Sequence, residues 1–203
     1  MKTFTLLLIA FAIFSCTNQP ENNNKNEAEW ETLVVSEIEK LAGDFKFTEG
    51  PAVDAKGNVY FTDIPNNRIF IWTSENKLDT FSLNSGHANG LYFDKDENLL
   101  ACERVNSQIS LTSPKGVKTA IATEYNGKIF NQPNDIWPDR KGGAYFTDPK
   151  YGGEDDELTQ DGMHVYYIIP DHKTVIRVCD DLEKPNGIIG TPDGKILYVT
   201  DAQ

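Results

Sequence analysis

Residues 134–148 read NDIWPDRKGGAYFTD, and this pattern of a polar residue, an apolar run, a turn and a second apolar run occurs four times. The other copies are EGPAVDAKGNVYFTD at 49–63, NGLYFDKDENLLACE at 89–103 and NGIIGTPDGKILYVTD at 186–201. The closing acid follows the opening residue by 14, 14, 14 and 15 positions in chain order. Each copy therefore predicts two antiparallel strands joined by a turn at a fixed place.

Successive copies begin 40, 45 and 52 residues apart, which is the length of one four-stranded propeller blade. Further β-branched and aromatic runs fit the remaining strands. We therefore predict an all-β fold, a β-propeller, with about three and a third blades in this chain; a β-sandwich with similar hairpins is the alternative. The predicted strands cover 58–62, 69–72, 99–102, 108–111, 144–147, 165–169, 174–178 and 196–200, and a short helix is expected at 31–41.

The innermost strand of a propeller blade lines the central channel, so the opening residues of the four copies should meet there. They are Glu49, Asn89, Asn134 and Asn186. One carboxylate with several amide oxygens favours calcium or magnesium over zinc, which prefers His and Cys. The alternative is that Asn-Gly and Asn-Asp serve only as turn dipeptides. That alternative does not account for Glu49.

Four motifs carry a resemblance to a known family: Glu49-Gly50-Pro51, Pro133-Asn134-Asp135, FTDPKYG at 146–152 and Pro185-Asn186-Gly187. With them the chain resembles the senescence marker protein/gluconolactonase family, also called regucalcin-like, from about residue 47 to residue 203. The resemblance implies a six-bladed propeller with one divalent cation on its axis that hydrolyses sugar lactones. Calcium is the first expectation for the cation, with magnesium or zinc as alternatives.

The resemblance also assigns residues. Glu49 and Asn186 match metal ligands of the family, and Asn134 matches an asparagine that binds the metal, its water or the substrate. Candidate substrate contacts are Asn89, Asn131, Asp148 and Tyr151. The family's remaining ligand, an aspartate and proposed general base, belongs to a later blade, so no catalytic base is assigned in this chain. We expect a truncated sequence that lacks roughly 100–130 residues and is inactive alone.

The implied reaction is hydrolysis of a sugar lactone such as gluconolactone, in which the cation polarises the carbonyl and activated water attacks. A non-catalytic propeller that binds a ligand or partner at the cell envelope is the alternative. Nucleic acid is not an expected partner, because 19 basic and 31 acidic residues give a net charge of −12. His87, two residues before Asn89, either reaches the channel or lies on the surface.

The N-terminus predicts export. Residues 1–15 read as a lipoprotein signal peptide whose apolar run ends at Cys16, the expected lipidation site, with an ordinary secretory signal as the alternative. The polar residues 16–30 predict a flexible tether, and residues 31–203 the partial propeller. We therefore expect a membrane-anchored lipoprotein of the bacterial envelope, periplasmic or on the surface. In the oxidising compartment that export implies, Cys102 and Cys179 could pair; because both are in strand-like runs, two buried free thiols are the expectation.

Overall fold

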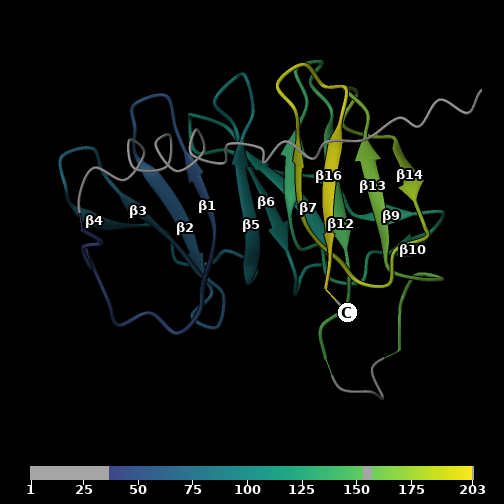
Figure 1. Ribbon diagram of the computed structural model, residues 1–203, viewed down its shortest axis with the longest axis horizontal. Helices are drawn as coiled ribbons and strands as arrows, with labels where there is room; N and C mark the ends of the chain where they lie inside the picture. The colour runs from purple at the N-terminus through teal and green to yellow at the C-terminus, as the bar shows by residue number, and fades with distance from the viewer. Residues whose placement is uncertain (1–36, 153–156, 203) are drawn as a thin grey trace, which may run out of the picture. The chain divides into compact units, whose positions relative to one another are not determined.

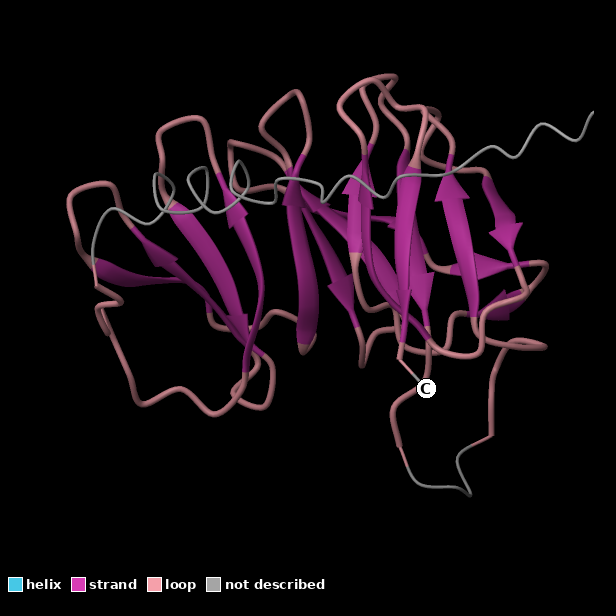
Figure 2. Cartoon of the chain, viewed as in Figure 1, coloured by secondary structure: helices cyan, strands magenta, loops and turns pink. Residues whose placement is uncertain are grey.

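The structure is a computed structural model that describes residues 37–152 and 157–202. The contacts of the chain divide it into residues 1–41 and residues 42–203, and the strands all belong to the second part. No described residue is helical (Figure 2). The helix predicted at 31–41 is therefore absent over 37–41; its remaining residues lie outside the described part. Ile38 is fully exposed and Leu41 is 57% exposed, so the apolar face that was to stabilise a short helix is not buried.

The described chain forms three four-stranded antiparallel sheets and one two-stranded sheet, each with its strands in chain order (Figure 1). A small hairpin of β9 and β10 follows the second four-stranded sheet. The sheets comprise β1 (Thr48–Val53), β2 (Val59–Asp63), β3 (Arg68–Trp72) and β4 (Leu78–Ser82); β5 (Ala88–Phe93), β6 (Leu99–Glu103), β7 (Gln108–Thr112) and β8 (Lys118–Ala122); β11 (Ile136–Pro138), β12 (Ala144–Asp148), β13 (His164–Ile168) and β14 (Val175–Cys179); β15 (Pro185–Gly190) and β16 (Leu197–Asp201); and, in the hairpin, β9 (Glu124–Tyr125) and β10 (Lys128–Ile129).

The first strands of successive sheets are neighbours in space. Contacts join β1 to β5, β5 to β11 and β11 to β15, so that these four strands form the inner layer. This is the arrangement of propeller blades, and it confirms the predicted all-β, propeller-type fold. The chain supplies three complete blades and the two inner strands of a fourth, close to the predicted three and a third.

The hydrophobic core lies between adjacent blades. One buried cluster lies between the sheets of β1–β4 and β5–β8, and a second lies between the sheets of β5–β8 and β11–β14. A third connects the sheet of β11–β14 to the hairpin of β15 and β16. The largest side chains of the second cluster, Phe130, Phe146 and Tyr166, are fully buried and contact one another through their rings. Blade-to-blade packing of this kind holds each inner strand at a fixed distance from the next.

Three of the four inner strands, β1, β5 and β15, have a bulge around the opening residue, whereas β11 pairs with β12 without a register shift. Strand pairing shifts between Glu49 and Ala52, between Ala88 and Leu91, and between Pro185 and Ile188. A bulge changes the direction of a side chain at a strand end. At Gly50, φ is +54° and an added Cβ would lie 2.2 Å from the carbonyl oxygen of Asn89, so only glycine fits.

Hydrogen bonds link three of the opening residues to the preceding blade. They run from Thr62 Oγ1 to the Asn89 carbonyl at 3.0 Å, from the Gly90 amide to the Asn134 carbonyl at 2.7 Å, and from Thr147 Oγ1 to the Asn186 carbonyl at 2.5 Å. Thr62 Oγ1 is also 3.0 Å from the Glu49 carbonyl of its own blade, so the backbone of all four opening residues is held in place, which prepares their side chains to act together.

The closing acids hold the loop that leads into each inner strand. In three blades the carboxylate accepts the amide N–H groups that stand three and two residues before the opening residue. The pairs are Lys46 and Phe47 on Asp63, Asn131 and Gln132 on Asp148, and Glu183 and Lys184 on Asp201. Glu103, in the second blade, instead pairs with Lys118 at 2.6 Å. The repeated acid therefore has a structural role.

Candidate functional site

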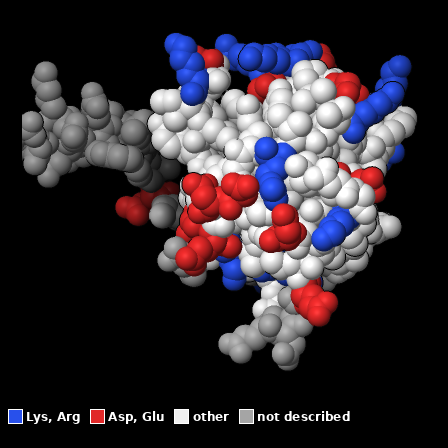
Figure 3. Space-filling view, turned by 90° about the vertical axis from the view of Figure 1, so that its right-hand side faces the viewer, with Lys and Arg blue, Asp and Glu red and all other residues white. Residues whose placement is uncertain are grey.

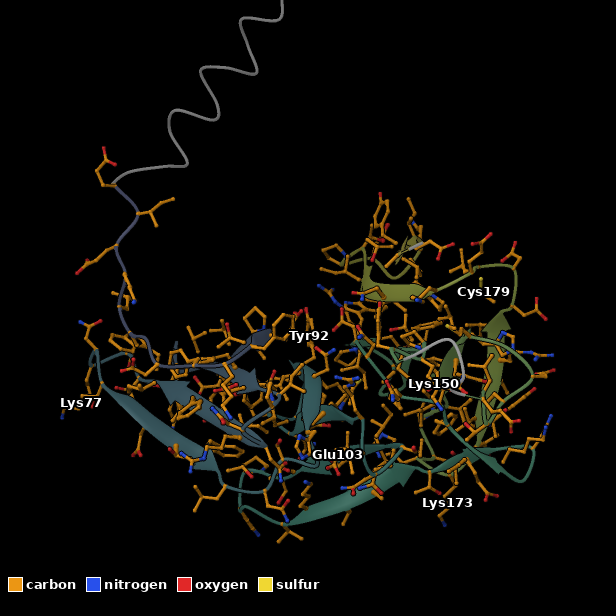
Figure 4. The ribbon with its side chains drawn as sticks, turned by 90° about the horizontal axis from the view of Figure 1, so that it is seen from below. Lys77, Tyr92, Glu103, Lys150, Lys173 and Cys179 are labelled. Carbon is orange, nitrogen blue, oxygen red and sulfur yellow. The ribbon has the colours of Figure 1, made fainter. Side chains whose placement is uncertain are left out.

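The four opening residues line one cavity of about 600 Å³, as the repeat predicts. Glu49, Asn89, Asn134 and Asn186 lie at the start of its walls, and Asp135 is beside them. Most of the remaining lining is apolar or aromatic; its members include Leu91, Tyr92, Ile188, Ile189, Tyr198 and Val199. Figure 4 views the molecule from the end at which β1, β5 and β15 begin, with Tyr92 labelled on the inner side of its blade. The cavity thus combines a polar group of side chains with an apolar wall.

Three of these polar side chains are free to bind a ligand. Glu49 is exposed, Asn89 is 9% exposed and Asn134 is 5% exposed. Within the described residues none of the three side chains makes a hydrogen bond. The amide atoms of Asn89 and Asn134 are not among the fully buried unpartnered atoms, so they stay accessible from the cavity that both residues line. Asn89 and Asn134 therefore have unused donor and acceptor capacity in the cavity.

Asn186 is oriented by a neighbour. Its side-chain N–H donates to the phenol oxygen of Tyr151, which leaves the amide oxygen of Asn186 available. The ammonium of Lys184 lies over the ring of Tyr151, 5.2 Å from its centre. Tyr151, predicted as a substrate contact, is not part of the cavity lining; its observed contact is with Asn186.

The donor set suits a hard divalent cation. It offers one carboxylate, on Glu49, and the amide oxygens of Asn134 and Asn186, which are the oxygen ligands that calcium and magnesium prefer. Among the described residues, no three His, Cys, Asp or Glu side chains lie together as a metal site. A site of this composition lacks the His and Cys ligands that zinc favours.

Asp135 is a site residue that the sequence analysis missed. Its two carboxylate oxygens accept the amides of Ile136 and Ile188, both at 2.9 Å, so it joins β11 to β15 beside the cavity. Burial raises the pKa of Asp135, the charge of Glu49 adds to the rise, and the two amide hydrogen bonds oppose it. The signal was an acid directly after Asn134, where the other three copies have glycine.

Asn131 is not brought to the cavity. Its side-chain N–H groups donate to the carbonyls of Asp148 and Gly162 at 3.2 and 2.9 Å. Its amide oxygen accepts from the amide and hydroxyl of Thr159 and from the amide of Gln160. With its capacity used in this way, Asn131 holds loops together and has no free group for the predicted substrate contact.

Asp148 also lies away from the cavity. It is fully buried and binds the amides of Asn131 and Gln132 at 2.8 and 2.9 Å. Burial raises its pKa to about 7, against the lowering effect of the two amide hydrogen bonds. The structure therefore gives Asp148 a structural position instead of the predicted substrate contact. His87 likewise does not line the cavity.

This geometry defines a class of protein: a β-propeller whose inner strands bring together a group of hard oxygen ligands. The chain belongs to the family described as the SMP-30/gluconolactonase/LRE-like region, whose model matches residues 47–203. This confirms the resemblance drawn from the motifs.

Individual relatives agree. The chain is 30% identical over 188 residues to a gluconolactonase of Zymomonas mobilis, with 83% of this chain and 52% of that protein covered. It is 27% identical over 195 residues to the lactonase drp35 of Staphylococcus haemolyticus, covering 87% of this chain and 54% of that protein. A solved gluconolactonase structure from Xanthomonas campestris superposes with a TM-score of 0.74 at 28% identity, covering 79% of this chain and 56% of that one. The chain thus spans about half the length of these relatives.

The predicted signal peptide, Cys16 and the tether lie outside the described residues. In 37–152 and 157–202 we find no helical segment with the length and hydropathy needed to cross a bilayer. Cys102 and Cys179 are both free thiols, as expected; Cys102 is fully buried and Cys179 is partly exposed. The face shown in Figure 3 interleaves acidic and basic side chains.

Proposed function

We propose that the protein is a hydrolase that opens a sugar lactone such as gluconolactone with the help of a divalent cation. The observation that carries the proposal is the convergence of Glu49, Asn134 and Asn186 on one cavity. Family membership and the lactonase relatives support the reaction class. Calcium is the proposed cation, because only one of these three ligands is charged and the other two are amide oxygens.

In the proposed reaction, the oxygen of a water molecule bonds to the lactone carbonyl carbon and the ring C–O bond breaks. One proton of the water ends on the released ring oxygen, which becomes a hydroxyl, and the new carboxylic acid loses its proton to solvent. A bound cation would supply Lewis acidity toward the carbonyl oxygen. Glu49, Asn134 and Asn186 would hold it, and Asn89 would orient the substrate through its free amide.

The scaffold keeps these side chains in place before the substrate arrives. Asp135 ties the backbone of β15 to β11, and the Thr147 hydroxyl fixes the carbonyl of Asn186. Groups that are already oriented need no reorganisation during the reaction, which is how fixed polar sites lower a barrier. The apolar wall at Leu91 and Ile188 would exclude water from the far side of the ring.

The test is hydrolysis of gluconolactone by the purified full-length protein, followed by proton release, with and without added calcium. Glu49→Gln should reduce calcium affinity and the hydrolysis rate by at least about 100-fold, because it removes the one charge among the three ligands proposed in residues 37–152 and 157–202. Glu75→Gln, in the exposed turn between β3 and β4, is the matched control. If the protein binds calcium through Glu49 but hydrolyses no lactone, the site is a binding site without catalysis.

Export and lipid anchoring at Cys16 remain a proposal, which the signal-like sequence at 1–15 supports. The protein should incorporate labelled palmitate in a bacterial host, and Cys16→Ser should abolish the label. Labelling of the Cys16→Ser variant at the level of the wild type would contradict the proposal.

A further inference from the structure

A second pocket, of about 550 Å³, lies beside the loops that lead into the inner strands. Its basic lining residues are His87, Arg104 and Lys150, and no acidic residue of the described ranges lines it. We call it the basic pocket. In a protein with a net charge of −12, a pocket with two permanent positive charges and no acidic residue among its described lining departs strongly from the average surface. Lys150 is labelled in Figure 4.

Arg104 is the central observation. Its Nε atom is buried and has no hydrogen-bond partner, while its Nη2 donates to the side-chain oxygen of Gln132 at 3.0 Å. Within the described residues Arg104 forms no ion pair. A guanidinium presents its donors in a planar fork that matches the oxygens of a phosphate or carboxylate. Nε itself is out of reach of a ligand, but the half-buried side chain keeps terminal N–H groups that make no hydrogen bond among the described residues and can present this fork to an anion in the pocket.

Lys150 leaves donors free as well. Its Nζ donates to the carbonyl of Glu157 at 2.7 Å and has two further N–H groups. His87 supplies no such donor: its Nδ1–H is directed to the carbonyl oxygen of Ile64 at 2.8 Å, and Nε2 is then an acceptor. The backbone at His87 has a φ of +52°, and its amide is held by the side chain of Asn67 at 2.8 Å.

The basic pocket is close to the central cavity along the chain. His87 is two residues from Asn89, and Gln132 is two residues from Asn134; the first of each pair lines the basic pocket and the second lines the cavity. Two residues span at most about 7 Å. One small molecule can therefore place a carbonyl in the cavity and an anionic group in the basic pocket. A sugar lactone with a phosphate or carboxylate on its exocyclic carbon has this form.

We infer that the basic pocket binds an anionic group of the substrate, so that the preferred lactones carry a phosphate or a carboxylate away from the ring carbonyl. This inference rests on the proposed function for its substrate class. It assigns Arg104 and Lys150 as specificity-determining residues that act on binding, without a part in breaking the lactone bond.

The experiment compares the KM values of three substrates: glucono-1,5-lactone, its 6-phosphate ester and the lactone of a uronic acid. The KM of the wild type should be at least about tenfold lower for a charged lactone, since a charge-assisted hydrogen bond is worth that factor. Arg104→Gln and Lys150→Gln should each raise the KM for that lactone about tenfold and leave the neutral lactone within about twofold. Lys195→Gln, in the exposed turn between β15 and β16, is the control.

The preferred lactone identifies the anion. Equal KM values for charged and neutral lactones, or an Arg104→Gln variant that affects both alike while its melting temperature is unchanged, would overturn the inference. Calorimetry with glucose 6-phosphate, glucuronate and glucose tests the pocket even if no lactone is hydrolysed, a result that would count against the proposed function alone. Tighter binding of either anionic sugar than of glucose by the wild type, lost in Arg104→Gln, supports the pocket. Equal binding of the three, or binding of none, refutes it.

Discussion

The side-chain amide of Asn186 donates a hydrogen bond to the phenol oxygen of Tyr151, and this contact decides which end of the amide faces the cavity. With its N–H engaged, Asn186 presents its oxygen, the atom that a cation needs. Tyr151 comes from the loop after β12 and Asn186 from β15, so the contact joins the third blade to the fourth. A residue that orients a metal ligand in this way commonly affects metal affinity.

Tyr151→Phe should therefore weaken calcium binding about tenfold while leaving the fold intact. Isothermal titration of calcium gives the affinity, and the melting temperature without metal reports the fold. Tyr198→Phe is the matched control, because Tyr198 also belongs to the cavity lining but is 58% exposed and makes no hydrogen bond through its hydroxyl among the described residues. If both variants bind calcium as the wild type does, the Asn186 contact does not tune the site.

Gly90 tests the close packing of the inner strands. An added Cβ would lie 2.5 Å from a carboxylate oxygen of Asp135 and 2.7 Å from the Asn134 carbonyl, so Gly90→Ala must displace β5 from β11. We expect a loss of about 2–3 kcal/mol in the free energy of unfolding, as for other overpacked sites. Denaturant titration measures it. Gly116→Ala, whose added Cβ meets nothing within 4 Å, should lose only about 1 kcal/mol from backbone strain. Equal losses would show that the contact at Gly90 relaxes freely.

Asp148 should make stability depend on pH. Burial raises its folded-state pKa to about 7, above the ordinary 3.8, so the folded protein favours the protonated carboxyl. Its contribution is complete below the ordinary pKa and is lost as the pH rises toward 7, with a slope of up to about 1.4 kcal/mol per pH unit. The free energy of unfolding of the wild type, relative to Asp148→Asn, should therefore fall between pH 4 and pH 7. A constant difference would contradict the raised pKa.

Asp63 occupies the equivalent position of the first blade, and its pKa shift has the opposite sign. Burial acts to raise its pKa, but hydrogen bonds from the amides of Phe47 and Lys46 and from Asn66 outweigh it, so the pKa is lowered. Asp63 therefore stabilises the fold above its ordinary pKa and loses this effect on acidification. Relative to Asp63→Asn, the wild type should become less stable as the pH falls below about 4.

The repeat made the inner half of each blade predictable, because its strands alternate around a fixed turn and end in a recurring acid. The outer strands were harder. β4 reads LDTFS and is mostly exposed, and β8 begins with three exposed residues, so neither has a pattern that distinguishes a strand from a loop. They form strands because β3 and β7 offer an edge to pair with.

The residues of the site also divide into predictable and unpredictable ones. The opening residues were predictable because the four copies of the repeat place them at the same position of each inner strand, where these strands converge at the propeller axis. The roles of Asn131 and Asp148 were not, because the partners of Asn131 at Thr159 and Gly162 are 28 and 31 residues away in the chain. The basic pocket likewise unites His87, Arg104 and Lys150 from three loops that share no motif. Contacts of this kind depend on the fold and not on local sequence.

A comparison of variants at Asn89 and Asn131 distinguishes a residue that binds substrate from one that stabilises the fold. Both are nearly buried asparagines that were predicted as substrate contacts, at 9% and 5% exposure. Asn131→Ala removes hydrogen bonds to Asp148, Gly162, Thr159 and Gln160, so we expect a loss of about 2–4 kcal/mol in the free energy of unfolding.

Asn89→Ala breaks no side-chain hydrogen bond within the described residues and should cost less than about 1 kcal/mol. It should instead raise the KM for the lactone about tenfold, because its free amide faces the cavity. Denaturant titration and lactone kinetics on the two variants give the two readouts side by side. If Asn131→Ala keeps its stability and loses substrate affinity, Asn131 is a substrate contact after all, since its hydrogen bonds to the loops would then be dispensable.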